Sequence, residues 1–268
     1  MGADTGTEQR LTPEERENWD RDGVLRFDPD CPMELIDGAM QDLEEKYLYG
    51  DEEKVENGVV YAGGRSPRIR EAWRVSENVK SIALLPKVLA VLKELFGREA
   101  QPFQTLNFSL PTQQAPHSDA MHFNSDPPGN MCGVWIAFED IDMDNGPLVY
   151  YPGSHRLPFT RIEDVGLDAH PDEFPTYPEF IRARNKHYEQ YVARQISEHG
   201  MEPQYGTIRK GEGIIWSANL VHGGTPRRDL ERTRHSQVTH YLFDSAQFFT
   251  EMQTEDGERK WKTAQWVT

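Results

Sequence analysis

The chain has 268 residues, of which 37% are hydrophobic, and a formal net charge of −16. This length fits a single domain with one core, and the hydrophobic residues leave no stretch long enough to span a membrane. Because phosphate binding needs clustered Lys and Arg, the acidic balance argues against a nucleic-acid partner. It favours a neutral or cationic small-molecule substrate, unless the charge serves solubility alone.

The first hundred residues predict helices. Residues 1–10 are mostly small and polar, and we expect them to be disordered. Thr12 and Pro13 followed by two glutamates combine an N-cap, a proline at the first helical position and a capping-box acid, so a helix begins there. The apolar spacing predicts a second helix from Met33 to Tyr47 and a third from Pro86 to Phe96, which a glycine ends.

From about residue 101 the pattern changes to short strands and turns. The clearest strand is expected from Met131 to Ile141, and the acidic segment 142–146 that follows is expected to be a hairpin turn. A long insertion then separates Leu157 from Gly206, and its centre, Pro178 to His199, predicts a helix. This insertion could cover the entrance of a site, or it could simply pack on the rim of a barrel.

Three residues form a pattern typical of a metal site. In an extended strand, residues i and i+2 point to the same side, so His117 and Asp119 would share one face. A third ligand, His222, follows a buried strand over 214–216 and precedes two glycines that let the backbone approach a site. A His-x-Asp pair and one distant His are the ligand set of a facial Fe(II) site that leaves coordination positions open.

Arg234 and Ser236 predict a carboxylate clamp. They begin a strand-like run over 234–243, and alternation puts both on one face, where a guanidinium fork and a hydroxyl could hold one carboxylate. His122 is a candidate for a substrate pocket: it would face away from the metal in a continuing strand, but a loop after Asp119 would reverse that. Trp135 is a second pocket candidate, with a role in the core as the alternative.

Taken together, these segments resemble the phytanoyl-CoA dioxygenase family of Fe(II)/2-oxoglutarate oxygenases. The similarity covers most of the chain. It is carried by Leu11–Glu15, Asp22–Leu25, Thr105–Phe108, His117–Asp119, Trp135–Asp140, Asn145–Leu148, Tyr151–His155 and Gly211–Ser236. The resemblance implies a single domain over 1–268 that is mainly β: a double-stranded β-helix, or jelly-roll (cupin-like) barrel, with the N-terminal helices packed on one side and the helical insertion near the active-site mouth.

The resemblance also implies the cofactors and their ligands. Fe(II) would be held by His117, Asp119 and His222. The far carboxylate of 2-oxoglutarate would be held by Arg234 and Ser236, with Asn107 as a further contact. O₂ would be the third reactant.

The implied reaction hydroxylates or oxidatively cyclises a small molecule, with release of succinate and CO₂. Halogenating relatives replace the metal-binding Asp with a small residue, so Asp119 argues against halogenation. The sequence around His117 and His122 is similar to that of members acting on sugar-containing metabolites, such as the orthosomycin oxygenases of antibiotic biosynthesis. The alternatives are a cupin-like metal enzyme that does not use 2-oxoglutarate, and an inactive metal-binding member of the family.

Two cysteines, Cys31 and Cys132, form no disulfide framework, and the reducing cytoplasm suits a ferrous enzyme. Cys132 lies in an apolar strand and is expected to belong to the core. No feature of the sequence indicates an oligomeric state.

Overall fold

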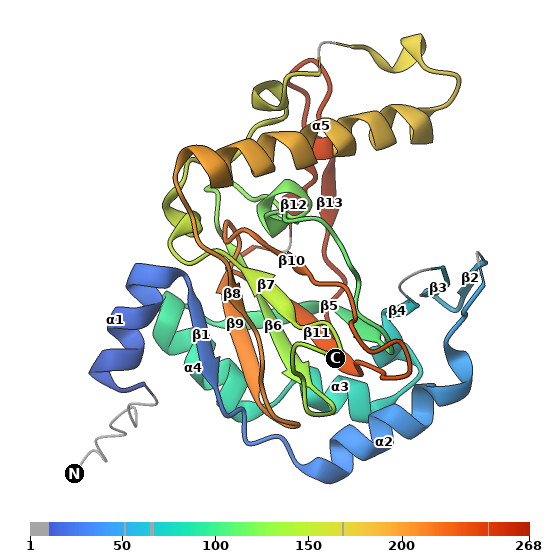
Figure 1. The fold of residues 1–268 in the computed structure, drawn as a ribbon, viewed down its shortest axis with the longest axis vertical. Coiled ribbons are helices and arrows are strands. Elements are labelled where there is room, and N and C mark those ends of the chain that lie inside the picture. Colours follow the sequence, from blue (N-terminus) through green and yellow to red (C-terminus); the bar gives the residue numbers. More distant parts are fainter. Residues whose placement is uncertain (1–10, 51, 65–66, 168, 246) are drawn as a thin grey trace.

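The computed structural model describes residues 11–50, 52–64, 67–167, 169–245 and 247–268 (Figure 1). Residues 1–10, for which disorder is expected, lie outside the described residues. The helices are α1 (Pro13–Asp22), α2 (Met33–Leu43), α3 (Glu77–Ala83), α4 (Pro86–Phe96) and α5 (Tyr177–Glu198). The strands are β1 (Val24–Phe27), β2 (Glu53–Glu56), β3 (Val59–Ala62), β4 (Arg68–Arg70), β5 (Ala100–Phe108), β6 (Met131–Ala137), β7 (Leu148–Tyr150), β8 (Gln204–Tyr205), β9 (Gly213–Ser217), β10 (His222–Gly224), β11 (Ser236–Phe243), β12 (Gln247–Phe249) and β13 (Trp261–Thr263).

Two antiparallel sheets form the body of the molecule. The larger sheet has eight strands in the order β1-β9-β6-β11-β5-β4-β3-β2, and the smaller has three in the order β10-β7-β8. Trp135 and Trp216 of the larger sheet pack with Leu148 and Tyr150 of the smaller one in a shared apolar cluster. The expected jelly-roll arrangement is therefore confirmed.

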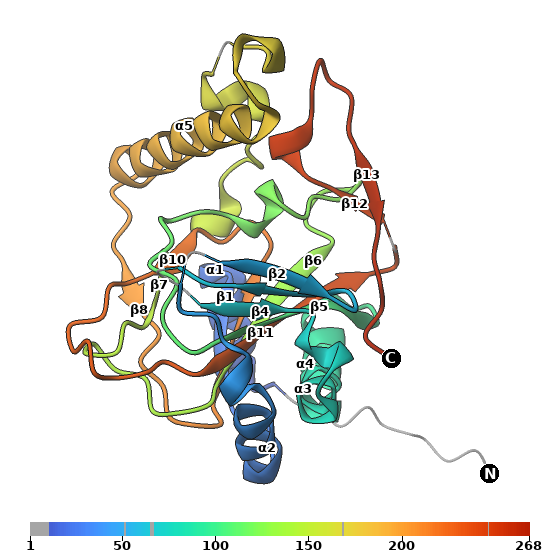
Figure 2. The ribbon, with the colours of Figure 1, turned by 90° about the vertical axis from the view of Figure 1, so that its right-hand side faces the viewer.

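The other face of the larger sheet is covered by helices (Figures 1 and 2). Side chains alternate along β6, so Val134 and Ile136 join the helix-side core with Ile36 of α2 and Val88 of α4, whereas Trp135 faces the smaller sheet. The N-terminal helices thus pack on one side, as expected. Within the described ranges, no helix is both long and apolar enough to cross a membrane.

Local sequence signals set the helix ends. The Thr12 side chain accepts a hydrogen bond from the Glu15 backbone N–H while the Glu15 side chain bonds back to Thr12, so the predicted capping box is confirmed. Helix α4 spans the predicted residues and ends at Gly97, whose φ of 67° lies in the left-handed region. Helix α2 is shorter than expected, because the chain tightens into a 3₁₀ turn over Glu44–Lys46.

The hairpin expected at 142–146 is wrong. Strand β6 already ends at Ala137, and the next strand, β7, pairs with β10 and β8 in the other sheet. Ile141, at the end of the predicted strand, enters the core between the sheets, and its backbone bridges to Ile208. The acidic segment therefore carries the chain from one sheet to the other.

The insertion carries the predicted helix, α5. In both views, α5 and the β12–β13 hairpin stand at the end of the molecule away from α2 (Figures 1 and 2). Arg184 of α5 is buried, and its guanidinium donates to the carbonyls of Met252 (3.0 Å) and Thr254 (2.8 Å). Helix α5 is thereby fastened to the chain that connects β12 to β13.

Candidate metal centre and co-substrate cavity

The fold brings His117, Asp119 and His222 together. One potential ligand atom from each lies within 4.8 Å of the other two. The His117 Nε2 atom is 3.8 Å from Asp119 Oδ1, and the His222 Nε2 atom is 3.8 Å from Asp119 Oδ2. All three residues are buried, so a metal ion bound here would meet two imidazoles and one carboxylate away from bulk water.

The backbone places the two histidines opposite each other. The N–H of each donates to the carbonyl of the other, at 2.8 Å from His117 and 2.9 Å from His222. Asp119 is not on a continuing strand, because Ser118 caps a 3₁₀ turn over Asp119–Met121. The expected extended run therefore stops at Ser118, and the turn presents the carboxylate to the histidines.

Backbone carbonyls orient both imidazole rings. The Nδ1 atoms of His117 and His222 each lie 3.0 Å from a carbonyl oxygen two residues earlier, those of Ala115 and Leu220. An Nδ1–H donated to that carbonyl leaves the Nε2 lone pair free for a metal. Burial, together with neighbouring His222, lowers the pKa of His117 to about 3, so this ring stays neutral at neutral pH.

Two residues that the sequence interpretation missed hold the Asp119 carboxylate. Its Oδ2 atom accepts a hydrogen bond from the indole N–H of Trp216 at 2.7 Å and lies 3.4 Å from His240 Nε2. Burial would raise the pKa of Asp119, but His222, His240 and His117 together hold it well below its usual range. His240 could have been found, because it continues the alternation that starts at Arg234 in the sequence.

A cavity of about 80 Å³ lies between the two sheets and contains both the metal ligands and the clamp arginine. It is lined by Leu106, Phe108, Thr112, Gln114, His117, Asp119, Trp135, Leu148, Trp216, His222, Gly223, Gly224, Arg234, Val238 and His240.

Arg234 and Ser236 are buried and available for a ligand. Arg234 is 3% exposed, and its guanidinium carbon lies 5.4 Å from the ring centroid of Trp135 and 5.7 Å from that of Phe108. Burial lowers its pKa to about 10, and among the described residues no carboxylate forms an ion pair with it. Within the part of the chain that the structure describes, the Arg234 Nε atom and the Ser236 Oγ atom have no hydrogen-bond partner. Arg234 lines the cavity, whereas Ser236 is not among the lining residues. Because buried polar groups are normally satisfied, the unpaired guanidinium fits the far carboxylate of a dicarboxylic co-substrate.

Asn107 does not reach the cavity. Its amide donates to Gln237 Oε1 at 3.2 Å, and the Gln237 amide donates in turn to the carbonyl of Val79 in α3. Strand alternation turns Leu106 and Phe108 toward the cavity and Asn107 toward the helices. The expected contact of Asn107 with the co-substrate is therefore corrected.

His122 and Trp135 lie at opposite ends of the site. The 3₁₀ turn over Asp119–Met121 reverses the strand alternation and brings the His122 ring to 6.0 Å from the His117 ring, measured between centroids. Trp135 instead lines the cavity next to Arg234, where its indole packs beside the guanidinium. This position favours a role for Trp135 in holding the clamp.

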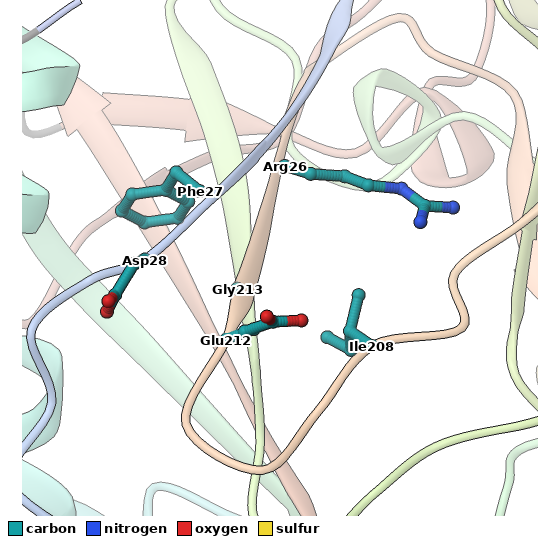
Figure 3. A pocket seen from close by; sticks show the side chains of 6 residues that line it. All are labelled: Arg26, Phe27, Asp28, Ile208, Glu212 and Gly213. Atoms are coloured by element: carbon teal, nitrogen blue, oxygen red, sulfur yellow. The ribbon is translucent and has the colours of Figure 1, made fainter.

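A larger hollow of about 330 Å³ lies elsewhere, where β1 meets the turn before β9 (Figure 3). The Arg26 guanidinium, which lines this hollow, donates to the carbonyls of Thr207 (3.2 Å) and Tyr205. The Glu212 carboxylate, also in the lining, accepts a hydrogen bond from the backbone N–H of Arg209 at 2.9 Å. Arg26 thus ties β1 to the chain before β9, and Glu212 closes the turn itself, so size alone does not identify the functional site.

Sequence comparison finds a family model that matches most of the chain. The family model described as phytanoyl-CoA dioxygenase (PhyH) matches residues 19–235. A mouse (Mus musculus) protein, phytanoyl-CoA dioxygenase domain-containing protein 1, is 36% identical over 86 residues, which are 31% of this chain and 30% of that protein. The aligned part thus spans less than a third of this relative.

Solved structures share the fold over most of the chain. The 2-oxoglutarate-dependent carbocyclase SnoK from nogalamycin biosynthesis is 16% identical, with a TM-score of 0.63, and the match covers 93% of this chain and 90% of SnoK. The epimerase SnoN, solved with Fe³⁺, 2-oxoglutarate (alpha ketoglutarate) and nogalamycin RO, is 19% identical, with a TM-score of 0.60 and coverage of 87% and 83%.

Proposed function

The chain belongs to the phytanoyl-CoA dioxygenase family, and from that membership we propose that it is a non-haem Fe(II)- and 2-oxoglutarate-dependent dioxygenase. It oxidises a small molecule, by hydroxylation or oxidative ring closure, and converts 2-oxoglutarate and O₂ to succinate and CO₂. The observation that carries the proposal is the content of one cavity: three metal ligands together with a buried arginine that has no anionic partner among the described residues.

Each part of the cavity has a role in this proposal. His117, Asp119 and His222 would hold Fe(II), which when bound supplies the activation of O₂ and the oxidation of substrate carbon. Arg234 and Ser236 would fix the far carboxylate of 2-oxoglutarate and so orient its other end toward the metal ligands. The apolar surroundings of the clamp exclude water, which strengthens its hold on a carboxylate.

The clamp also separates this proposal from its rivals. A cupin-like metal enzyme that does not use 2-oxoglutarate has no need of a buried arginine facing the metal cavity. An inactive family member has no need of a complete ligand set. The Asp119 carboxylate, fixed by Trp216, occupies the position that a halide would require and so argues against halogenation.

Anaerobic titration tests the proposal. Adding 2-oxoglutarate to the protein with Fe(II) is expected to produce a visible charge-transfer band, and admission of air is expected to produce succinate. Iron binding without 2-oxoglutarate binding would favour the cupin-like alternative. Binding of both, with no succinate formed with any candidate substrate, would favour an inactive member.

We also propose that the substrate is a secondary metabolite, and that a sugar-containing compound such as those of the orthosomycin oxygenases is the first to test. The fold is similar to two enzymes of nogalamycin biosynthesis, which supports a natural-product substrate. His122, on the metal side of the cavity, is the candidate for substrate contact. Glycosyltransferase genes beside this gene would support the assignment, and genes for acyl-CoA enzymes would contradict it.

The two cysteines support an expected site of action in the reducing cytoplasm. Cys31 and Cys132 are both buried and unpaired. Burial, with a contribution from Asp119, raises the pKa of Cys132 well above its usual range, so this thiol stays protonated in the helix-side core.

A further inference from the structure

Two arginines lie on the cavity side of the larger sheet. In the register of β4 with β5, Arg68 is opposite Phe108 and Arg70 is opposite Leu106. Residues directly opposite in an antiparallel pair point to the same face, with their Cβ atoms about 5 Å apart. Both partners line the cavity, whereas Ile69 between the arginines is fully buried in the helix-side core. The arginines are exposed, so they stand on the cavity face where it opens to solvent.

A lysine approaches the same opening from the C-terminal hairpin. Lys262 of β13 donates from Nζ to the Thr250 hydroxyl at 3.2 Å, and that hydroxyl donates to the carbonyl of His122 at 2.9 Å. Burial and the nearby charge of Arg70 lower the pKa of Lys262, which indicates that the two cations are neighbours. Lys262 lies beyond the residues that match the family model.

Two carboxylates, Glu53 and Glu71, lie close enough to act on the charges of Arg68 and Arg70, but neither forms an ion pair with them. Among the described residues, none of the three basic groups forms an ion pair, whereas Lys260 on the same hairpin is 2.8 Å from Glu255. Glu71, next to Arg70 in the chain, instead accepts a hydrogen bond from the Trp73 indole at 2.7 Å. Unpaired cations that converge at an opening create a local positive potential, which attracts anions whatever the net charge of the chain.

We propose that Arg68, Arg70 and Lys262 form a subsite that binds a phosphate or carboxylate group of the substrate at the mouth of the cavity. The inference rests on the proposed function. The net charge of −16 favours a neutral or cationic substrate, whereas this surface favours a substrate that carries an anionic group. The anionic group would be held beside His122, while the carbon to be oxidised reaches the metal ligands.

Three sugars that differ in one group test the subsite: glucose, glucose 6-phosphate and glucuronate. Each is titrated by calorimetry, under nitrogen, into protein that holds Fe(II) and saturating 2-oxoglutarate, so that Arg234 is already occupied. At least one anionic sugar is expected to bind tenfold or more tightly than glucose, and which one binds distinguishes phosphate from carboxylate. Equal binding of all three sugars would overturn the inference.

Variants locate the effect. Arg70→Gln and Lys262→Gln are each expected to reduce the preference for the anionic sugar at least fivefold and to leave 2-oxoglutarate binding unchanged. Lys260→Gln removes a cation from the same hairpin and is expected to change neither. An equal loss in the Lys260 variant would overturn the inference, because it would indicate a non-specific charge effect. If the native protein produces no 2-oxoglutarate band, the proposed function fails, and titration of the metal-free Arg70, Lys262 and Lys260 variants still decides the subsite, because Arg234 is the same in all of them.

Discussion

The deep end of the cavity and its mouth are built in different ways. At the deep end, Arg234 and Trp135 are nearly inaccessible to solvent. Trp135 lies on β6, and Arg234 lies two residues before β11, where its backbone N–H donates to the carbonyl of Ser109. At the mouth, a 3₁₀ turn brings His122, a C-terminal hairpin brings Lys262, and β4 brings Arg70. Strand register fixes the part that would bind the co-substrate, whereas separate segments form the part that would meet the substrate. Such a division lets one reaction serve different substrates.

The largest effect is expected at the metal ligands. His222→Ala removes one of three ligands and is expected to abolish both iron binding and succinate formation, because the two remaining side chains hold the metal too weakly. Anaerobic Fe(II) titration and a succinate assay measure the two losses. His199→Ala, an exposed histidine that follows α5, is the matched control and is expected to behave like the native protein. Near-normal activity of the His222 variant would contradict the ligand assignment.

The next largest effect is expected at the clamp. Arg234→Ala is expected to weaken 2-oxoglutarate binding by about 2–4 kcal/mol, roughly 30- to 1000-fold, since it removes a charged hydrogen-bond donor from a buried site. Iron affinity is expected to stay within a few-fold of native, because Arg234 is not among the ligands. Titration of the visible band measures both. Arg232→Ala, which removes a surface ion pair with Asp142, serves as the control. A parallel loss of iron binding would show that the deep end and the metal site are not independent.

A smaller effect is expected from the residue that positions the carboxylate ligand. His240→Ala is expected to weaken metal binding about 10- to 100-fold, the usual cost of removing a group that orients a ligand. Co(II) titration of the metal-free protein measures the affinity, and His240→Asn, which keeps a side-chain donor, is expected to recover part of it. His235→Ala changes a histidine of the same segment whose ring lies against Tyr47, 5.9 Å between centroids. Equal affinities in the His240 and His235 variants would contradict the positioning role.

The sequence predicts the deep end of the cavity better than its mouth. Alternation predicted that Arg234 and Ser236 share a face; Arg234 lines the cavity, but it lies before the strand that begins at Ser236. His117 and Asp119 do come together, through a 3₁₀ turn and not through the extended run that was predicted. The contact of Asn107 with the co-substrate was implied by the family resemblance alone. Its neighbours Leu106 and Phe108 line the cavity, so alternation along β5 turns Asn107 away from it. The hairpin expected after Ile141 is wrong because the sequence pattern from Met131 to Ile141 does not reveal where the chain leaves one sheet for the other. Contacts such as that of Lys262 with Thr250 depend on the conformation of long connecting segments, which local sequence pattern does not predict.

The smallest effect is expected where α5 touches the metal site. The Tyr188 hydroxyl accepts the buried backbone N–H of Ser118 at 2.8 Å, between two of the ligands. Tyr188→Phe leaves that N–H without a partner and is expected to destabilise the protein by about 1 kcal/mol, measured by urea unfolding. Tyr191→Phe, one turn along the same helix, is the control.

A lid that opens in each turnover would have to break the hydrogen bond between Tyr188 and Ser118 and withdraw Arg184 from its two carbonyls. We therefore expect limited proteolysis within residues 160–205 to be the same with and without Fe(II) and 2-oxoglutarate. Protection from proteolysis that appears only with the ligands would indicate that α5 moves at the mouth of the cavity. Weaker metal binding in the Tyr188 variant would indicate that α5 also positions the metal ligands.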